Sequence, residues 1–195
     1  MIQWAKVGNS KSLEESYKKG VEAFNAGRFS EAVDRFTRVL SVTPTDTSAL
    51  NNRAICYRQL EKYEDALSDV STAILIDPRQ ALFYSTKATI LTKLHRQLEA
   101  VEELNKAIDI EPVLEYVTNK VVILKKLNKY QEALEGIEAI ESKGLGSEEL
   151  TLYKGTIFFE IKKFNEARAA FVSLKNPEIQ KIAQQYLSAI NSAKS

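Results

Sequence analysis

Apolar residues recur along most of this chain at the spacing of an amphipathic helix. Between residues 51 and 75 they lie mostly three to five positions apart, at Ile55, Leu60, Tyr63, Leu67, Val70 and Ile74. Such spacing places apolar side chains on one face of a helix. The polar pair Glu61–Lys62 interrupts the pattern, and Pro78, which cannot continue a helix, closes it. The segment therefore predicts two helices that meet near residue 61 and pack against each other.

The same pattern returns in five copies. An alanine recurs at steps of 34, 34, 33 and 34 residues, at Ala32, Ala66, Ala100, Ala133 and Ala167. Twelve positions before it lies a column of mostly small residues, Gly20, Ala54, Ala88, Val121 and Gly155. Four positions after it lies a bulkier apolar column, Phe36, Val70, Leu104, Ile137 and Phe171. Because small side chains let helices cross closely, the columns predict a stack of helical hairpins.

A third column is mostly aromatic, and prolines close the first three copies. The column lies three positions before the alanines, at Phe29, Tyr63, Gln97, Tyr130 and Phe164. The prolines are Pro44, Pro78 and Pro112, at intervals of 34 residues. Together these positions resemble the tetratricopeptide repeat family. The resemblance extends from Leu13 to about Asn176 and implies an all-α fold, a right-handed solenoid of stacked antiparallel helix hairpins.

The expected domain follows from these boundaries. Residues 1–12 are expected to form an N-terminal tail, because "SLEE" (12–15) has the form of a capping box that starts a helix at Leu13. The repeat domain then covers 13–195, with repeats at about 13–46, 47–80, 81–113, 114–147 and 148–176. A C-terminal capping helix is expected at about 177–192, with one face formed by Ile179, Ile182, Tyr186 and Ile190. In the tail, Trp4 is expected to fold back on the first hairpin or to dock on a partner or a second copy.

Composition and charge exclude several classes of function. Lys and Arg total 27 against 26 Asp and Glu, so the chain lacks the basic excess of nucleic-acid-binding proteins. Apolar runs such as "VVIL" (121–124) are too short to cross a membrane. The single cysteine, Cys56, allows no internal disulfide and fits a reducing compartment, and the N-terminus has no signal-peptide pattern. We therefore expect a soluble cytoplasmic protein that binds neither nucleic acid nor membrane.

No set of residues predicts catalysis. Cys56 and His95 are the only thiol and imidazole, and their places in the repeat differ by five residues, about 7 Å along a helix axis. One His and one Cys cannot form a zinc site. "GLGS" (144–147) lacks the lysine of a phosphate-binding loop and is followed by two glutamates. The sequence therefore predicts no enzyme, no metal site and no cofactor.

The resemblance implies a binding groove lined by the first helix of each hairpin. The expected groove residues are Asn51, Asn52, Ile55, Arg58, Gln59, Ser85, Thr86, Thr89, Lys93, Thr118, Asn119, Val122 and Lys126. The first copy adds Tyr17, Val21 and Phe24, and the fifth adds Leu152, Thr156 and Phe159. Amide side chains can donate to and accept from a peptide backbone, and the cations can bind carboxylates. We therefore expect a protein or peptide partner in this groove.

A more specific partner can be tested on the sequence. Some co-chaperones of the family bind the C-terminal Glu–Glu–Val–Asp of heat-shock chaperones through a clamp of two Asn, two Lys and one Arg. The corresponding positions here are Tyr17, Val21, Asn52, Leu82 and Thr86, of which only Asn52 matches. Without the Lys and Arg the clamp loses its charge-assisted hydrogen bonds. We therefore predict no strong binding to this tail.

Two alternatives stay open at this point. A basic column, Lys19, Arg53, Lys87, Lys120 and Lys154, is either a charged ladder for an acidic partner or a set of long stems over apolar neighbours with their heads in water. The function we expect is that of an adaptor, co-chaperone-like in kind, which binds a partner segment in its concave groove. The alternative is a structural subunit that self-associates, as a weak homo-oligomer, through its tail or convex face.

Overall fold

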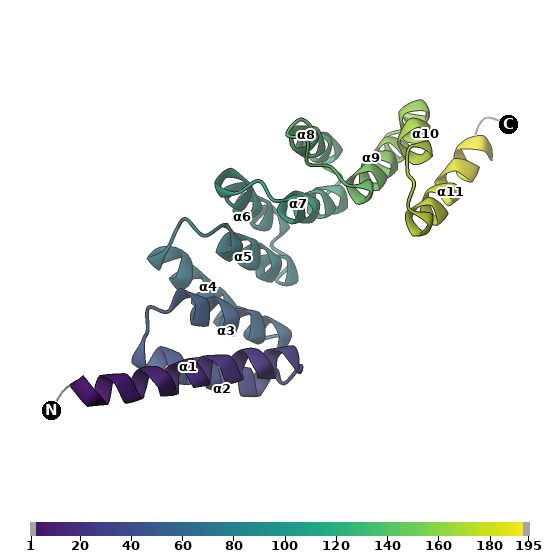
Figure 1. Ribbon diagram of the computed structural model, residues 1–195. Coiled ribbons are helices and arrows are strands. Elements are labelled where there is room, and N and C mark those ends of the chain that lie inside the picture. The colour runs from purple at the N-terminus through teal and green to yellow at the C-terminus, as the bar shows by residue number, and fades with distance from the viewer. Residues whose placement is uncertain (1–2, 193–195) are drawn as a thin grey trace. The chain divides into compact units, whose positions relative to one another are not determined.

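The described part of the chain is entirely helical. The computed structural model describes the backbone of residues 3–192 and the side chains of residues 11–192, and it has eleven α-helices and no strand in that part (Figure 1). The first six helices are α1 (Gln3–Asn25), α2 (Phe29–Val42), α3 (Thr47–Gln59), α4 (Tyr63–Ile76), α5 (Ala81–Lys93) and α6 (Gln97–Ile110). The other five are α7 (Leu114–Lys126), α8 (Tyr130–Glu141), α9 (Glu148–Glu160), α10 (Phe164–Val172) and α11 (Pro177–Ser192). The predicted all-α class is confirmed.

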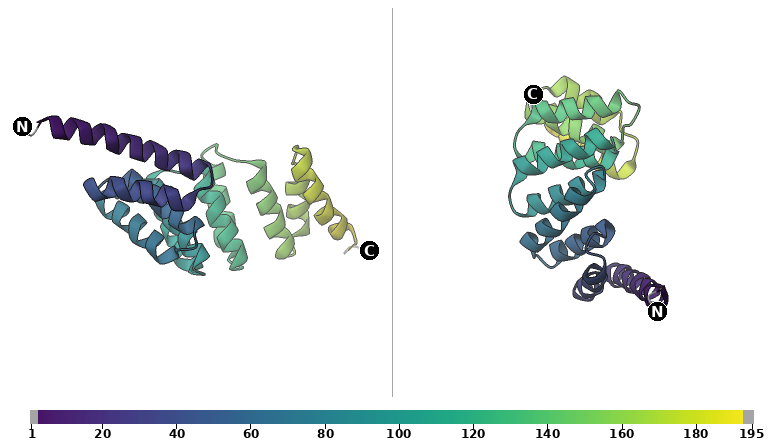
Figure 2. Two further views of the ribbon diagram at one scale, coloured as in Figure 1. Left: turned by 90° about the horizontal axis from the view of Figure 1, so that it is seen from below. Right: turned by 90° about the vertical axis from the view of Figure 1, so that its left-hand side faces the viewer.

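The helices pack as successive antiparallel hairpins. Each odd-numbered helix from α1 to α9 packs against the even-numbered helix that follows it, and neighbouring first helices lie side by side within a unit (Figure 2). The final helix, α11, packs against α9 and α10. The stacked hairpins of the expected fold are therefore confirmed.

Every hairpin turn has the same backbone geometry. One residue in each turn has a positive φ, between 58° and 72°, at Gly27, Glu61, His95, Asn128 and Lys162. The amide that follows it donates to a carbonyl five residues earlier, as from Lys62 to Tyr57 and from Arg96 to Leu91, both at 2.9 Å. This is the closing bond of a Schellman motif, which satisfies carbonyls at the end of the first helix. The predicted break at residues 61–62 is confirmed.

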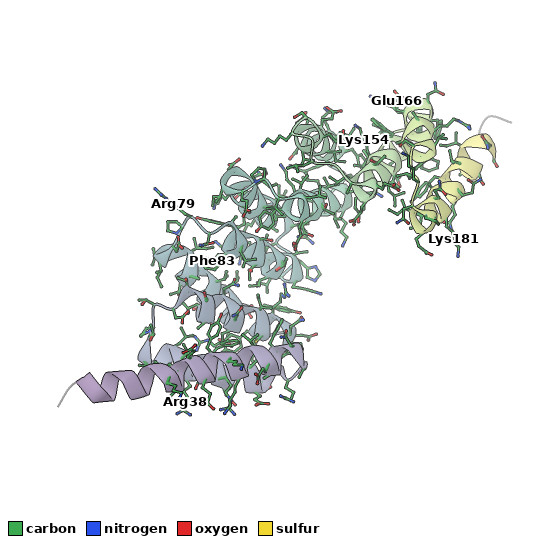
Figure 3. The ribbon with its side chains drawn as sticks, viewed as in Figure 1. Arg38, Arg79, Phe83, Lys154, Glu166 and Lys181 are labelled. Carbon is green, nitrogen blue, oxygen red and sulfur yellow. The ribbon has the colours of Figure 1, made fainter. Side chains whose placement is uncertain are left out.

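The chain divides into two compact units. Unit 1 is Met1–Glu111 and contains α1–α6, and unit 2 is Pro112–Ser195 and contains α7–α11. In unit 1 the core includes Phe36, Val70 and Phe83, all of which are buried. Figure 3 labels Phe83 on α5. The core of unit 2 includes Phe171 and Ile190. All five alanines of the repeat column are fully buried, which accounts for the absence of larger residues there. The single repeat domain over 13–195 stays a prediction.

The two ends differ from the expectation. The first helix begins at Gln3 rather than Leu13, so Ser12 lies inside it, where its carbonyl accepts a hydrogen bond from the Ser16 hydroxyl at 2.9 Å. The capping-box pattern was misleading because its residues are equally compatible with a helix interior when helix precedes them. The expected tail is thus largely helical in its backbone, and the prediction for the Trp4 side chain lies outside the described residues.

The capping helix has a slightly different buried face from the expected one. Ile182 is 46% exposed, whereas Ala183 and Ile190 are buried and Ile179 and Tyr186 pack against the core. The buried set therefore follows steps of four, three and four residues, which keep to one face of a helix better than the predicted set. Among the described helices, none is both long and apolar enough to cross a membrane.

Candidate functional site

The basic column mostly forms ion pairs inside the stack. Arg53 on α3 donates two hydrogen bonds to Asp69 on α4, at 2.6 and 2.7 Å, and the hydrogen bond to Asp69 raises the pKa of the guanidinium. Lys87 pairs with Glu103 at 3.0 Å, and Lys154 pairs with Glu141 at 2.8 Å.

These three cations therefore join helices, and neither interpretation of the column describes them. At the N-terminal end of the column Lys19 pairs with Glu15 on its own helix. The sequence signal for the pairs of Arg53 and Lys87 is an acidic residue sixteen positions after each of them. No acidic residue lies sixteen positions after Lys19, Lys120 or Lys154.

Four of the expected groove residues are buried, three of them in unit 1 and Thr156 in unit 2. Asn51, Ser85 and Thr86 are 3%, 5% and 5% exposed, so they do not belong to a binding surface. The expectation was wrong because α3 and α5 each pack against several neighbours within unit 1, α3 against α1, α2, α4 and α5, and α5 against α3, α4 and α6, which leaves a narrower exposed stripe than the family pattern implies. Asn51 also keeps its Oδ1 atom buried without a hydrogen-bond partner.

The other groove residues of the second and third repeats do reach solvent. They are Asn52, Ile55, Arg58, Gln59, Thr89 and Lys93, and we call this set the inner row. It contains amides, a hydroxyl and two cations, but no carboxylate. In unit 2 the predicted residues Thr118, Asn119 and Val122 are half-buried and Lys126 is exposed on α7.

Hydrogen bonds tie the inner row to its neighbours. Asn52 Nδ2 on α3 donates to the Tyr17 hydroxyl on α1 at 2.8 Å, and Arg58 Nη1 donates to Thr89 Oγ1 on α5 at 2.7 Å. The two bonds therefore fix three successive first helices at their exposed side. They also hold Asn52 and Arg58 in defined positions before any ligand arrives.

Arg58 is half-buried and has no acidic partner. Among the described residues, no carboxylate lies within ion-pair distance of its guanidinium, and its one hydrogen bond goes to a neutral hydroxyl. Burial lowers its pKa, and no nearby charge opposes that shift. A guanidinium remains protonated even so, because its ordinary pKa is far above neutral pH.

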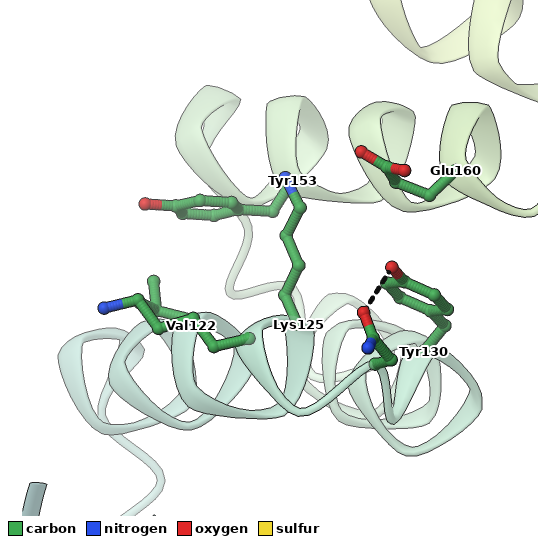
Figure 4. Close-up of a pocket in the computed structure, with 7 residues that line it drawn as sticks. Val122, Lys125, Tyr130, Tyr153 and Glu160 are labelled. Atoms are coloured by element: carbon green, nitrogen blue, oxygen red, sulfur yellow. Dashed lines mark hydrogen bonds between the residues drawn. The ribbon is translucent and has the colours of Figure 1, made fainter. Parts of the chain in front are cut away.

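A pocket of about 490 Å³ opens between α7 and α9 in unit 2 (Figure 4). Its lining residues are Val122, Lys125, Lys126, Asn128, Tyr130, Tyr153 and Glu160. Lys125 crosses from α7 to α9, where its ammonium donates to Thr156 Oγ1 at 2.8 Å. Burial lowers the pKa of Lys125, and the charge of Glu160 opposes this shift.

The sequence identified Val122 and Lys126 of this pocket but missed Lys125 and Tyr153. The repeat itself carried the signal for Lys125, since steps of 34 and 33 residues lead from Arg58 to this position. Thr156, which was expected in the groove, is 4% exposed and contributes only by holding Lys125.

A second pocket of about 500 Å³ lies in unit 1. Its lining residues are Leu13, Glu14, Tyr17, Val39, Thr43, Asp46 and Ser48. Tyr17 is the one predicted groove residue among them, and its pKa is raised by burial first and by the charge of Asp46 second. Asp46 already accepts the Ala49 amide at the start of α3, at 2.9 Å, so this carboxylate has a structural task.

Cys56 and His95, the only thiol and imidazole of the chain, lie in different surroundings. Cys56 is fully buried within α3, and burial raises the pKa of its thiol to about 11. His95 is exposed in the turn between α5 and α6. Within residues 11–192, no cluster of three His, Cys, Asp or Glu side chains could hold a metal ion. At the clamp positions, Leu82 is exposed, Thr86 is buried and Asn52 already bonds Tyr17.

Comparisons with known proteins identify relatives of the same architecture. A family model described as "Tetratricopeptide repeat" matches residues 17–81. Sperm-associated antigen 1 of Rattus norvegicus is 39% identical over 94 residues, which are 48% of this chain and 10% of that protein. Hsp70-Hsp90 organizing protein 2 of Arabidopsis thaliana is 33% identical over 141 residues, 70% of this chain and 25% of that protein. The chain thus spans a quarter or less of the length of these relatives.

Solved structures show the same fold. The crystal structure of the MamA protein superimposes with a TM-score of 0.72 at 18% identity, covering 83% of this chain and 89% of MamA. The first repeat domain of Spaghetti (RPAP3), bound to the HSP90 peptide SRMEEVD, gives a TM-score of 0.58 at 25% identity and covers 60% of this chain and 94% of that one. The second domain of human RPAP3, in complex with the HSP70 peptide SGPTIEEVD, gives 0.53 at 27% identity, covering 55% and 91%.

Proposed function

This chain belongs to the tetratricopeptide repeat family, and on that premise we propose that it is a non-enzymatic adaptor that binds a segment of a partner protein against its first helices. The observation that carries the proposal is the inner row, where amide, hydroxyl and cationic groups lie together without a carboxylate. Such groups bind a peptide backbone and its acidic side chains, whereas they offer no nucleophile or base.

The order already present in the inner row supports binding. Asn52 and Arg58 are held by Tyr17 and Thr89, so little side-chain freedom is lost when a ligand contacts them. Asn52 uses one amide hydrogen for Tyr17 and keeps its other hydrogen and its carbonyl oxygen for a peptide. Ile55 adds an apolar contact between them. The row is thus suited to an extended segment with mixed polar and apolar residues.

The partner segment is expected to differ from the chaperone tails of the relatives. RPAP3 domains at 25% and 27% identity are described with HSP90 and HSP70 peptides ending in EEVD. In this chain the clamp positions provide Asn52 alone, and Thr86 is too buried to contact a ligand. A co-chaperone-like role therefore requires contacts other than the five-residue clamp.

Affinity capture from lysate with quantitative mass spectrometry tests the proposal. Asn52→Ala with Asn119→Ala removes one inner amide from each unit, and we expect at least one specific partner to be lost at least tenfold. The matched control is Gln131→Ala with Gln185→Ala, which removes exposed amides from α8 and α11. If the Asn52→Ala, Asn119→Ala variant captures every partner as well as the unmodified chain does, the proposal is contradicted.

Light scattering tests the alternative of self-association. We expect a constant monomer mass from micromolar to millimolar concentration. The alternative, a structural subunit, would be favoured by a mass that rises with concentration to the same extent in the unmodified chain and in the Asn52→Ala, Asn119→Ala variant. The cytoplasmic location stays a prediction.

A further inference from the structure

Two cations occupy equivalent places in the two units. Arg58 lies near the end of α3 and Lys125 near the end of α7, at the same position of the repeat. Each donates a hydrogen bond to a threonine 31 residues later on the next first helix, Arg58 to Thr89 at 2.7 Å and Lys125 to Thr156 at 2.8 Å. The arrangement is therefore a repeated feature of this chain.

Each threonine is oriented to hold its cation. The Thr89 hydroxyl donates to the carbonyl of Thr86 at 2.7 Å, and the Thr156 hydroxyl donates to the carbonyl of Tyr153 at 2.8 Å. With the proton used there, the oxygen presents a lone pair to the cation. The cation is thus fixed in position, but its charge is not neutralised.

This lack of neutralisation separates the two cations from Arg53 and Lys87 of the basic column. Arg53 and Lys87 reach buried carboxylates on the second helix of their own hairpin. Arg58 and Lys125 are also partly buried, yet no described carboxylate lies within 4 Å of either. Because removing a cation from water without a counter-ion is unfavourable, each position favours the arrival of an anion.

We infer that Arg58 and Lys125 are carboxylate-binding positions, one in each unit, for acidic side chains of the partner segment; the inference rests on the proposed function. Each cation has donors to spare after bonding its threonine, four N–H groups on Arg58 and two on Lys125. A carboxylate can therefore bind while the threonine contact persists. Neither residue is at a clamp position, so this mode of binding differs from that of the chaperone-tail clamp.

The pocket around Lys125 adds a second feature that a bound segment must match, besides its carboxylate. Val122, Tyr130 and Tyr153 give it apolar surface, and the Tyr130 hydroxyl is already bonded to Asn128 at 2.8 Å (Figure 4). Glu160 lies in the same pocket and is exposed, and it acts on Lys125 through its charge without forming an ion pair. The carboxylate of a partner segment must therefore compete with Glu160 for Lys125. Removal of the Glu160 charge is expected to strengthen the binding of that segment.

A random decapeptide display library, selected on the whole chain, tests the inference. We expect enriched peptides to contain Asp or Glu at fixed positions. For each such peptide, fluorescence anisotropy compares the acidic form with its Asn or Gln analogue. Arg58→Met or Lys125→Met is expected to weaken one acidic peptide about tenfold or more and to leave its amide analogue within about twofold.

Control variants separate these sites from general charge. Arg79→Met removes an exposed guanidinium from the loop between α4 and α5 in unit 1 (Figure 3), and Lys143→Met removes an exposed ammonium in unit 2. Both are expected to keep the affinity of the acidic peptides within about twofold. Glu160→Gln is expected to raise the affinity of the peptides that depend on Lys125 by about two- to fivefold. Thermal unfolding of each variant verifies that it is folded, and Arg58→Gln, which keeps a hydrogen-bond donor for Thr89 but removes the charge, replaces Arg58→Met if the latter unfolds.

The outcomes distinguish the inference from the proposed function. Selection of no peptide at all would overturn both. Selected peptides without acidic enrichment, or acidic peptides that Arg58→Met and Lys125→Met bind as well as the unmodified chain, would overturn this inference while leaving peptide binding intact. A loss that the Arg79→Met and Lys143→Met controls share would also overturn it.

Discussion

A Cβ atom at Gly155 would lie 2.6 Å from Cε1 of Phe171, so the aromatic ring occupies the space that any larger residue would need. The same relationship holds in the first hairpin, where a Cβ atom at Gly20 would lie 2.9 Å from Cε1 of Phe36. In the other hairpins the corresponding pairs are Ala54 with Val70, Ala88 with Leu104, and Val121 with Ile137. Glycine thus compensates for the size of phenylalanine in the first and fifth hairpins.

Gly155→Ala is expected to destabilise the chain by about 1–3 kcal/mol, the cost of overpacking a buried crossing. Phe171 cannot easily withdraw, because it is 2% exposed and its ring stacks on Tyr186 at 5.2 Å. Urea unfolding followed by circular dichroism measures the change. Gly136→Ala is the control, because nothing lies within 4 Å of a Cβ atom there.

The compensation can be tested by a double-mutant cycle. Phe171→Leu combined with Gly155→Ala reproduces the small–large pair Ala88 and Leu104 of the third hairpin. We expect the double variant to be less destabilised than the sum of the single variants by about 1 kcal/mol. Strict additivity would show that the two residues do not share the space that the geometry indicates.

The small, bulky and alanine columns and the turns could be predicted from the sequence, because the same residue types recur at the same positions of each repeat. Side-chain pairing between helices could not. The partner of Arg53 depends on which face of α4 carries Asp69, and the burial of Ser85 depends on how closely adjacent hairpins stack. The extent of α1 was missed because a capping pattern outside its structural context does not specify a helix start.

The turn residues give a prediction of the opposite sign. Lys162 adopts φ 61°, a left-handed conformation that costs a residue with a side chain about 1 kcal/mol. Lys162→Gly is therefore expected to stabilise unit 2 by up to about 0.5–1 kcal/mol, even though glycine gains freedom in the unfolded chain. Gly27→Ala, at φ 72°, is expected to destabilise unit 1 by about 1 kcal/mol. Thermal unfolding measures both changes in stability. A destabilised Lys162→Gly variant would contradict the left-handed conformation of Lys162.

The ion pair between Arg53 and Asp69 is expected to matter more than an exposed pair of similar geometry. The side chains are 18% and 9% exposed, so Asp69→Ala leaves a partly buried guanidinium and should cost about 2–3 kcal/mol. Arg96 and Glu99 form an equally short pair whose side chains are 46% and 51% exposed. Glu99→Ala should therefore destabilise the chain much less than Asp69→Ala, because solvent screens an exposed pair. Equal losses in urea unfolding would mean that burial does not determine the contribution of the pair.

The buried thiol gives a prediction that depends on pH. Burial raises the pKa of Cys56 from 9.0 to about 11, so the folded protein has about 100-fold less thiolate at pH 8 than an unshifted thiol. A disulfide reagent such as 5,5′-dithiobis(2-nitrobenzoic acid) should thus react at least about 100-fold more slowly with the native chain than with the urea-unfolded chain.

The effect of this shift on stability has a definite sign. Since the folded state keeps the proton longer, the contribution is fully present below about pH 9 and is lost as the pH rises toward 11. Cys56→Ser abolishes this dependence, so the unmodified chain should lose more stability than the variant between pH 8.5 and 10.5. If the free energy of unfolding of the unmodified chain and of the Cys56→Ser variant depends on pH in the same way, this prediction is contradicted.

The last prediction concerns the chaperone tails that the RPAP3 relatives are described with. Of the five clamp positions, Tyr17 and Asn52 bond each other, Leu82 is apolar and Thr86 is 5% exposed. A fluorescein-labelled SRMEEVD peptide is therefore expected to bind more weakly than about 100 μM in anisotropy titrations, because the charge-assisted bonds to its two carboxylates are missing. Leu82→Lys with Tyr17→Lys adds two of the missing cations at accessible positions and should improve the affinity by about tenfold. Low-micromolar binding by the unmodified chain that Asn52→Ala abolishes would show that a clamp operates without its cations.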